Sequence, residues 1–532
     1  MSNKEQSPDA GPLNSADGYA FEGPALDLGA LVVDGEPAAD KQVRIPLAMM
    51  NRHGLVAGAT GTGKTKTLQG LAEQLSAAGV PVFLADVKGD LSGLGVPGES
   101  SEKLLQRTKA LGQDWSPTAF PVEFYSLGGK DPGSPIRATP TSFGPTLLAK
   151  VLQLNETQTS CLELIFHWAD GKGMLLLDLK DVRSVVSYLT SDEGKGELKE
   201  LGGVSAATAG VILRELTSFE AKGAECFFGE PQFEVGDLIR QDPQGRGVIS
   251  VLELAAVQSQ PELFSTFLMW LLAELFHTQP EVGDLDQPKL VFFFDEAHLL
   301  FKGASKHFVE SVTQTVRLIR SKDVGIFFVT QTPKDVPADV LAQLANRIQH
   351  ALRAFTPDDA KALKATVSTF PKSDYDLATV LTSLAIGEAV VTVMSETGAP
   401  TPVAWTRLRA PQSLMAPMDA AALTAAVAAS PLAAKYGQMV DRYSAYEMLD
   451  SQRAQSQAQA EAAAAAARED AERLKAAKAE AARPTRASGS TTTRNSPPPN
   501  SLDAVLNSKF AKNLANSTGR ELVRGLLGAL KR

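Results

Sequence analysis

The segment that most restricts the fold of this chain is a glycine-rich run of eight residues that matches the pattern G-x-x-x-x-G-K-[ST] in full. The run consists of Gly58, Ala59, Thr60, Gly61, Thr62, Gly63, Lys64 and Thr65. It follows an apolar stretch, 55–57, and precedes residues with helical spacing, so the pattern predicts a loop between a buried strand and a helix. Glycines let the backbone N–H groups of such a loop turn inward at the helix N-terminus, where anions bind. A chance glycine-rich turn would lack these flanks.

The polar residues of this run predict a site for a nucleotide and its magnesium ion. We expect Lys64 to place its charge against β- and γ-phosphate oxygens, and the Thr65 hydroxyl to bind Mg²⁺. Lys66 and Thr67 continue into the first turn of the helix, and we assign all ten residues, 58–67, to nucleotide binding. The predicted cofactors are therefore ATP and Mg²⁺.

A strand that ends in two acids is the expected companion of this loop. Residues 290–294 are apolar without alternation, which indicates a strand covered on both faces, and Asp295 and Glu296 follow it. We expect Asp295 to hold the magnesium through water and Glu296 to act as the general base that activates the attacking water. The alternative is an acidic pair that only caps a helix.

Two further predicted strands end in polar residues. Gln331 follows the strand over 324–330, and Asp86 and Lys88 lie at the end of the strand over 80–87. Ligands of open α/β sheets bind at the C-terminal ends of the strands, so we predict that Gln331 positions the water or senses the γ-phosphate. Capping of loops is the alternative role for Asp86 and Lys88.

Strands that alternate with helices predict an α/β fold with a three-layer, parallel P-loop NTPase sheet, a helical insertion and a C-terminal helical arm. Composition divides the chain into seven segments. They are a short extended segment (1–50), the first part of the ATPase core (51–142), a mostly helical insertion (143–285), the second part of the core (286–410), an alanine-rich helical arm (411–487), a flexible linker (488–500) and a basic amphipathic tail (501–532).

Charge and cysteine content limit the classes of function. The net charge is −9, yet residues 483–532 carry nine Lys or Arg against two acids, which leaves about −16 on the rest of the chain. An acidic body argues against a broad DNA-binding face, because duplex binding rests on neutralised phosphates, but it leaves room for a narrow basic pore. Two cysteines exclude a disulfide-rich secreted scaffold. We find no signal peptide and no transmembrane segment, so we expect a cytoplasmic protein.

The motifs together resemble the HerA-FtsK branch of P-loop ATPases. The similarity runs through GATGTGKT, FLADVKGDL, VFFFDEAH, GIFFVTQTP and LRAFTPDD, and extends over about residues 20 to 410. Their order and spacing are similar to HerA-like helicases of the YjgR-type bacterial group. The resemblance implies a RecA/HerA-like core, a homo-oligomeric hexameric ring with active sites between subunits, and DNA in a central channel.

The same resemblance implies an arginine that acts on the neighbouring subunit's nucleotide. Arg353 occupies that position, on a strand that we predict over 348–355, with Arg347 as the nearest alternative and Arg317 or Arg320 as outside candidates. A guanidinium supplied in this way stabilises charge on the transferred phosphoryl group. HerA-type proteins carry an N-terminal β-barrel that docks a nuclease. About fifty residues precede the phosphate loop here, which is too few for that barrel and argues against a nuclease partner.

Two functions follow from these observations. The first is an ATP-hydrolysing DNA translocase or helicase that acts as a ring, and the motif set favours it. The second is a nucleotide-gated scaffold that assembles protein partners without moving DNA, and the acidic body favours it. A P-loop kinase fits poorly, because the Asp-Glu and Gln strand ends suit the activation of water. The basic tail is either a solvated end or a helix that binds nucleic acid, an anionic membrane or an acidic partner.

Overall fold

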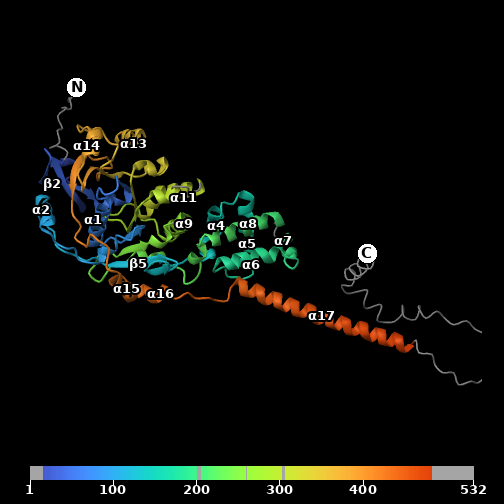
Figure 1. Ribbon diagram of the computed structural model, residues 1–532. Helices are drawn as coiled ribbons and strands as arrows, with labels where there is room; N and C mark the ends of the chain where they lie inside the picture. The colour runs from blue at the N-terminus through green and yellow to red at the C-terminus, as the bar shows by residue number, and fades with distance from the viewer. Residues whose placement is uncertain (1–15, 201–204, 259, 302–305, 482–532) are drawn as a thin grey trace, which may run out of the picture. The chain divides into compact units, whose positions relative to one another are not determined.

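The computed structural model describes residues 16–200, 205–258, 260–301 and 306–481 (Figure 1). The chain divides into two units, residues 1–455 and 456–532. The first unit holds every predicted site residue. The predicted linker and basic tail, 488–532, lie outside the described residues.

The first unit is built on one sheet of twelve strands in the described part of the chain. The strands are β1 (Ala25–Val33), β2 (Glu36–Pro46), β3 (Gly54–Ala57), β4 (Val82–Asp86), β5 (Val122–Leu127), β6 (Ser134–Ile136), β7 (Ile249–Glu253), β8 (Leu290–Phe294), β9 (Val324–Thr330), β10 (Asn346–His350), β11 (Glu388–Thr392) and β12 (Ala404–Leu408). Their order across the sheet is β2-β1-β12-β11-β10-β3-β9-β8-β4-β7-β5-β6.

The strands from β10 to β6 in this order run parallel, which confirms the predicted α/β class. The strands on the other side of β10 pair antiparallel, and this edge was not predicted. It begins with a hairpin, β1–β2, built by the residues before the phosphate loop. The sheet is therefore mixed, with the phosphate loop following a strand in its parallel part.

Besides the sheet, the described residues form α-helices of very different lengths. They are α1 (Lys64–Ala77), α2 (Glu102–Ala110), α3 (Pro140–Phe143), α4 (Pro145–Val151), α5 (Glu156–Gly171), α6 (Leu179–Thr190), α7 (Lys195–Glu200), α8 (Ala206–Ala221), α9 (Pro261–Thr278), α10 (His298–Phe301), α11 (Lys306–Leu318), α12 (Ala338–Leu341), α13 (Pro357–Val367), α14 (Leu377–Ser383), α15 (Ala420–Ala429), α16 (Pro431–Tyr436) and α17 (Ala445–Ala481). Among the described residues, no helix combines the length and apolarity needed to cross a membrane.

The strand β8 shows why its sequence is apolar without alternation. Phe292 and Phe294 belong to the core on the side of α9 and α11, whereas Val291 and Phe293 belong to the core on the side of α1. Both faces of the strand are thus buried, and helix, sheet and helix form three layers.

The segment 143–285, expected as a helical insertion, contributes to the sheet as well. Helices α4 to α8 lie together at the end of the unit away from β2 (Figure 1). The strand β7, however, lies between β4 and β5 in the central sheet. The helix α9 packs against the sheet, and the ring centroids of its Phe267 and of Phe83 on β4 are 6.4 Å apart. Only part of the segment is therefore separate from the core.

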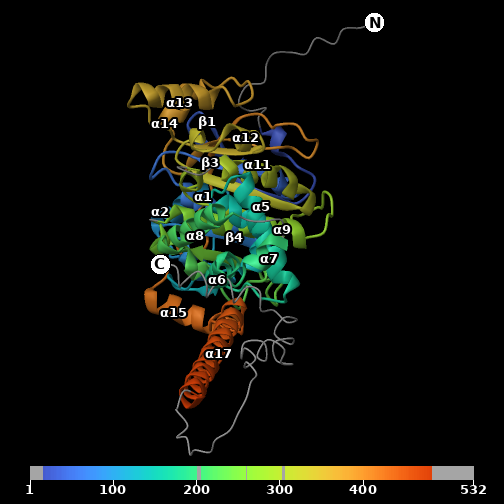
Figure 2. The same cartoon turned by 90° about the vertical axis from the view of Figure 1, so that its right-hand side faces the viewer.

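The strand predicted to run from Ile348 to Phe355 is shorter than expected. The strand β10 ends at His350, Ala351 and Leu352 after it are buried, and residues 353–356 are exposed before α13 begins. Helices α13 and α14 lie side by side next to this edge of the sheet (Figure 2). Their apolar residues pack with Leu352 and Val390 in a small third core. Arg353 therefore lies beyond the strand on which it was placed.

Candidate active site

The phosphate loop joins the end of β3 to the start of α1, as the sequence predicts. Gly58 and Gly63 have φ angles of 155° and 109°. A Cβ atom on Gly58 would lie only 2.4 Å from the Cβ of His350, so a larger residue cannot fit there. The loop is thus tightly packed at its base, whereas a Cβ atom on Gly61 would meet nothing within 4 Å.

Lys64 is buried with its ammonium group inside this loop. Its Nζ donates to the carbonyl oxygens of Gly58 at 2.7 Å and Ala59 at 3.1 Å. Burial lowers the pKa of Lys64, and the nearby charges of Glu296 and Asp295 partly oppose this. These charges act on the lysine because the loop and the acidic strand end lie close together. The ammonium group therefore lies within the loop that the sequence predicts to bind phosphates.

The residues after Lys64 differ in their contacts. Thr65 is half-buried in the first turn of α1. The Nζ of Lys66 donates to the side-chain oxygen of Gln69 at 3.1 Å. The Thr67 hydroxyl lies 2.9 Å from Nε2 of His350, so it faces the sheet. Of the two threonines, Thr67 is held against the sheet, so Thr65 is the one that could bind a magnesium ion.

Asp295 directly follows β8 and is almost completely buried. Its Oδ1 accepts the backbone N–H of Glu296 at 2.9 Å. Its Oδ2 is buried and has no hydrogen-bond partner in the described part of the chain. Burial, together with the charge of Glu296, raises the pKa of Asp295 to about 7. A buried carboxylate oxygen without a partner is suited to Mg²⁺ or to a water bound to it, so these residues fit that cation.

Glu296 is also buried, and it is held as a charged group. Its φ angle is 47°, and Lys88 donates to its Oε1. Burial alone would raise the pKa of Glu296, but the hydrogen bond and charge of Lys88 outweigh this and the pKa lies below its ordinary range. Nδ1 of His298 lies 3.1 Å from Oε2, but the two atoms are not aligned for a hydrogen bond. Glu296 is thus ionised at neutral pH and able to accept a proton.

The sheet order brings several predicted residues to the same edge. The strands β9, β8, β4 and β7 are parallel neighbours. The last residues of β4 and β7 are Asp86 and Glu253, whereas Asp295 and Gln331 directly follow β8 and β9. Gln331 is exposed, and among the described residues no hydrogen bond joins it to Lys64 or Glu296. Gln331 therefore shares the edge of the sheet with the other predicted residues and, within the described part of the chain, is not hydrogen-bonded to Lys64 or Glu296.

The candidate arginines have different surroundings. Arg353 is exposed and makes no ion pair or hydrogen bond within the described residues. Arg347 is half-buried and donates to the carbonyl oxygen of Thr369 at 3.4 Å. Arg320 lies 3.4 Å from Asp284, and Arg317 is exposed on α11. Ala351, two residues before Arg353, accepts the backbone N–H of Ala59 in the phosphate loop at 2.8 Å. Arg353 is thus an exposed candidate close in sequence to a residue that contacts this loop.

His350 is a site residue that sequence reasoning missed. It is fully buried, and its Nδ1 lies 3.1 Å from the carbonyl oxygen of Thr62. A carbonyl only accepts, so Nδ1 carries the proton and Nε2 accepts from the Thr67 hydroxyl. Burial and the charge of Lys64 lower the pKa of His350 to about 3. A single histidine at a strand end carries no motif, and 283 residues separate it from Thr67, so the sequence offers no signal for this contact.

Glu253 is a second residue that the sequence did not identify. It ends β7 opposite Asp86 of β4 and is almost completely buried. Burial, together with the charges of Asp86, Asp131 and Asp90, raises the pKa of Glu253 to about 8. It adds a carboxyl group to an edge that already holds Asp295 and Glu296.

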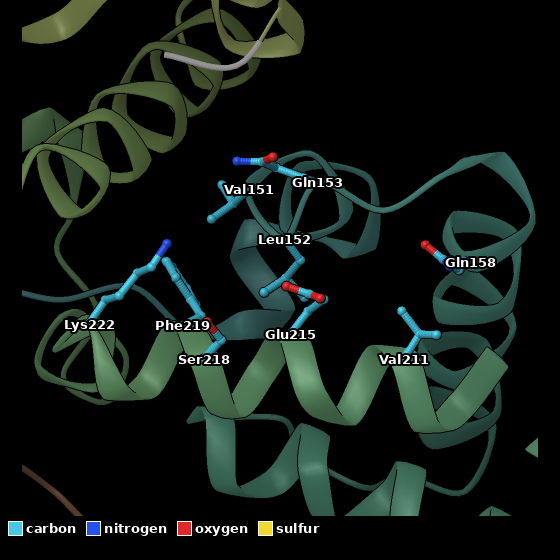
Figure 3. A pocket seen from close by; sticks show the side chains of 9 residues that line it. All are labelled: Val151, Leu152, Gln153, Gln158, Val211, Glu215, Ser218, Phe219 and Lys222. Atoms are coloured by element: carbon cyan, nitrogen blue, oxygen red, sulfur yellow. The ribbon is translucent and has the colours of Figure 1, made fainter. Parts of the chain in front are cut away.

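A further pocket lies among the helices and contains none of the predicted site residues. Its volume is about 310 Å³. Figure 3 shows that side chains of α8 line one wall and that residues at the end of α4 lie opposite them. The lining residues are Val151, Leu152, Gln153, Gln158, Val211, Glu215, Ser218, Phe219 and Lys222. This pocket is therefore distinct from the nucleotide loop.

Comparison with known proteins identifies a family and a curated relative for this chain. The family model described as helicase HerA-like C-terminal matches residues 32–532. The DNA double-strand break repair helicase HerA of Sulfurisphaera tokodaii is 22% identical over 374 residues, which cover 66% of this chain and 64% of that protein. The chain thus spans less than two thirds of that relative's length.

Solved structures show a similar fold. The bacterial conjugative coupling protein TrwB, in its unbound form, has a TM-score of 0.50 at 16% identity, covering 76% of this chain and 94% of its own. VirB4 of Thermoanaerobacter pseudethanolicus has a TM-score of 0.44 at 14% identity, covering 73% of this chain and 97% of its own. The likeness to TrwB shows that the two proteins share an α/β fold.

Proposed function

We propose that this chain, which belongs to the HerA-like helicase family of P-loop ATPases, is an ATP-hydrolysing motor that acts on DNA as a ring. The proposal rests on the chemistry of its site. The observation that carries this proposal is the placement of a buried, ionised Glu296, one residue after Asp295, where its charge acts on Lys64 of the phosphate loop.

Each residue of the site has a distinct role in this proposal. The loop N–H groups and Lys64 bind the β- and γ-phosphates. Thr65 and Asp295 would hold Mg²⁺, which would neutralise phosphate charge. Glu296 takes a proton from the water whose oxygen attacks the γ-phosphorus, while the bond from that phosphorus to the bridging oxygen breaks. Products are ADP and inorganic phosphate.

The ring and its DNA are the finer part of the proposal. Arg353 is exposed and unpaired in the described part of the chain, so its guanidinium is available to a neighbouring subunit's nucleotide. Gln331, exposed at the same edge, is proposed to sense the γ-phosphate. DNA passes through a central channel lined by a small part of the surface, which is compatible with a net charge of −9.

A scaffold that assembles with proteins under the control of ATP is the second candidate, and the acidic body favours it. The two candidates are separated by the ATP turnover rate with and without single- and double-stranded DNA, measured alongside the mass in solution by light scattering. A DNA motor turns over faster with DNA, loses that stimulation at high salt and forms a multimer with ATP. An ATP turnover rate that neither kind of DNA changes at any salt concentration would favour the scaffold.

A further inference from the structure

Lys88 forms an ion pair with the proposed general base. Its Nζ donates to Oε1 of Glu296. The Lys88 side chain is 42% exposed, whereas that of Glu296 is 6% exposed, so the lysine reaches the buried carboxylate from the solvent side. The two residues leave the sheet from the neighbouring strands β4 and β8, which pair through Ala85 and Phe294.

The loop that carries Lys88 is fixed by a buried carboxylate. Asp86 accepts the backbone N–H groups of Lys88 at 3.1 Å, Gly89 at 2.8 Å and Leu91 at 2.8 Å. Asp86 is completely buried at the end of β4. The backbone of Lys88 is therefore held in one place, and only its side chain is free to adjust.

We propose that Lys88 is a positioning residue for ATP hydrolysis, whose ammonium group holds Glu296 in the orientation from which it activates water. This inference rests on the proposed function. Lys88 engages Oε1, whereas Oε2 is buried, makes no hydrogen bond among the described residues and has Nδ1 of His298 3.1 Å away. In this inference the lysine holds one carboxylate oxygen and leaves the other, beside His298, to the attacking water. A buried carboxylate that lost its cation would turn away or lose its charge.

Lys88 and Lys64 have separate tasks, and this separation makes the inference testable. Lys64 is bonded to the loop carbonyls and meets the phosphates, whereas Lys88 is bonded to the base. Removal of Lys64 should therefore weaken ATP binding. Removal of Lys88 should slow the chemical step and leave the affinity for ATP nearly unchanged.

The experiment compares kcat and KM for ATP in the full chain, the Lys88→Met variant and the Lys88→Arg variant. Lys103→Met is the matched control, because Lys103 is an exposed lysine on α2. We expect Lys88→Met to lower kcat about tenfold or more, with KM changed less than about threefold. Lys88→Arg should recover part of the rate because it restores a cation, and Lys103→Met should match the wild type.

Binding of a fluorescent ATP analogue shows that each variant is folded, and Lys88→Arg provides a second test if Lys88→Met fails to bind it. Wild-type kcat in Lys88→Met, a parallel loss of ATP affinity and rate, or a Lys88→Arg variant that binds ATP yet stays as slow as Lys88→Met would overturn the inference. The proposed function fails separately, if the wild type itself does not hydrolyse ATP or if Glu296→Gln turns over normally.

Discussion

At the scale of single residues, the sheet edge that carries the candidate site holds opposite charges close together in a buried setting. Lys64 donates to the phosphate loop and Lys88 to Glu296, whereas one oxygen of Asp295 has no hydrogen-bond partner among the described residues. Each charge thus has a specific position before any nucleotide arrives. Such preorganisation lowers the cost of rearrangement at the moment of reaction.

Two substitutions should separate binding from chemistry at this edge. Lys64→Ala removes the cation nearest to the phosphates, so we expect weaker ATP binding and almost no hydrolysis. Glu296→Gln keeps the shape of the side chain but cannot take a proton, so ATP binding should persist while turnover falls by about a hundredfold or more. Equilibrium binding and a phosphate-release assay measure the two properties. A Glu296→Gln variant that fails to bind ATP would show that Glu296 is a ligand and not the base.

His350 gives a prediction about stability and pH. Its pKa is about 3 in the folded chain and ordinarily 6.5, so the unfolded chain binds the proton more tightly. This group therefore stabilises the fold above pH 6.5, and the contribution is lost as the pH falls from there toward 3. Between pH 7 and pH 5 the loss is about 2 kcal/mol.

Denaturant unfolding at these two pH values tests the assignment. Wild-type protein should lose more unfolding free energy on acidification than His350→Gln, by about 2 kcal/mol, because glutamine does not titrate. The comparison is made within each protein, so any general effect of the substitution cancels. Equal losses in the two proteins would mean that His350 is not held neutral by burial.

At the scale of elements, some strands were predictable and others were not. The strand β8 is apolar on both faces because both faces are covered, and that pattern is visible in its sequence. The phosphate loop before α1 could likewise be predicted from its glycines. The end of β10 was misjudged, because residues 351–355 look like strand but Ala351 bonds to the phosphate loop and Phe355 is 81% exposed.

The antiparallel edge and the His350 contacts depend on pairings between distant parts of the chain. The strand β1 pairs with β12, with Gly29 of β1 opposite Leu408 of β12. Local sequence cannot specify which strands meet across such a distance. Lys88 was noticed as a strand-end residue, but its pairing with Glu296 required the order of β4 and β8 in the sheet.

The basic C-terminal tail gives a prediction at this scale. Every proposed site residue lies before residue 354, and the tail follows the predicted linker at 488–500. Deletion of residues 484–532 should therefore leave ATP turnover without DNA unchanged. It should weaken binding at low salt to DNA, to anionic vesicles or to the acidic body of the chain, because eight cations are removed. Complete loss of turnover in the shortened chain would contradict a separate tail.

At the scale of the whole molecule, the account requires subunits that complete one another's sites. Lys64 is proposed to act on its own subunit's nucleotide and Arg353 on the neighbour's. Arg353→Ala and Lys64→Ala should each be inactive alone, and mixing them should restore part of the ATP turnover. Activity returns only where an intact loop meets an intact arginine, so it should depend on the mixing ratio. Full activity of Arg353→Ala alone would transfer this role to Arg347 or another arginine.

The most direct test of the central claim is movement along DNA driven by ATP. The measurement is the release of a labelled third strand from a DNA triplex by the wild-type chain, with Glu296→Gln as the matched control that still binds ATP. We predict release with ATP and Mg²⁺ in the wild type and none in Glu296→Gln. A wild-type chain that hydrolyses ATP rapidly in the presence of the triplex and releases no strand would contradict the account and favour the nucleotide-gated scaffold.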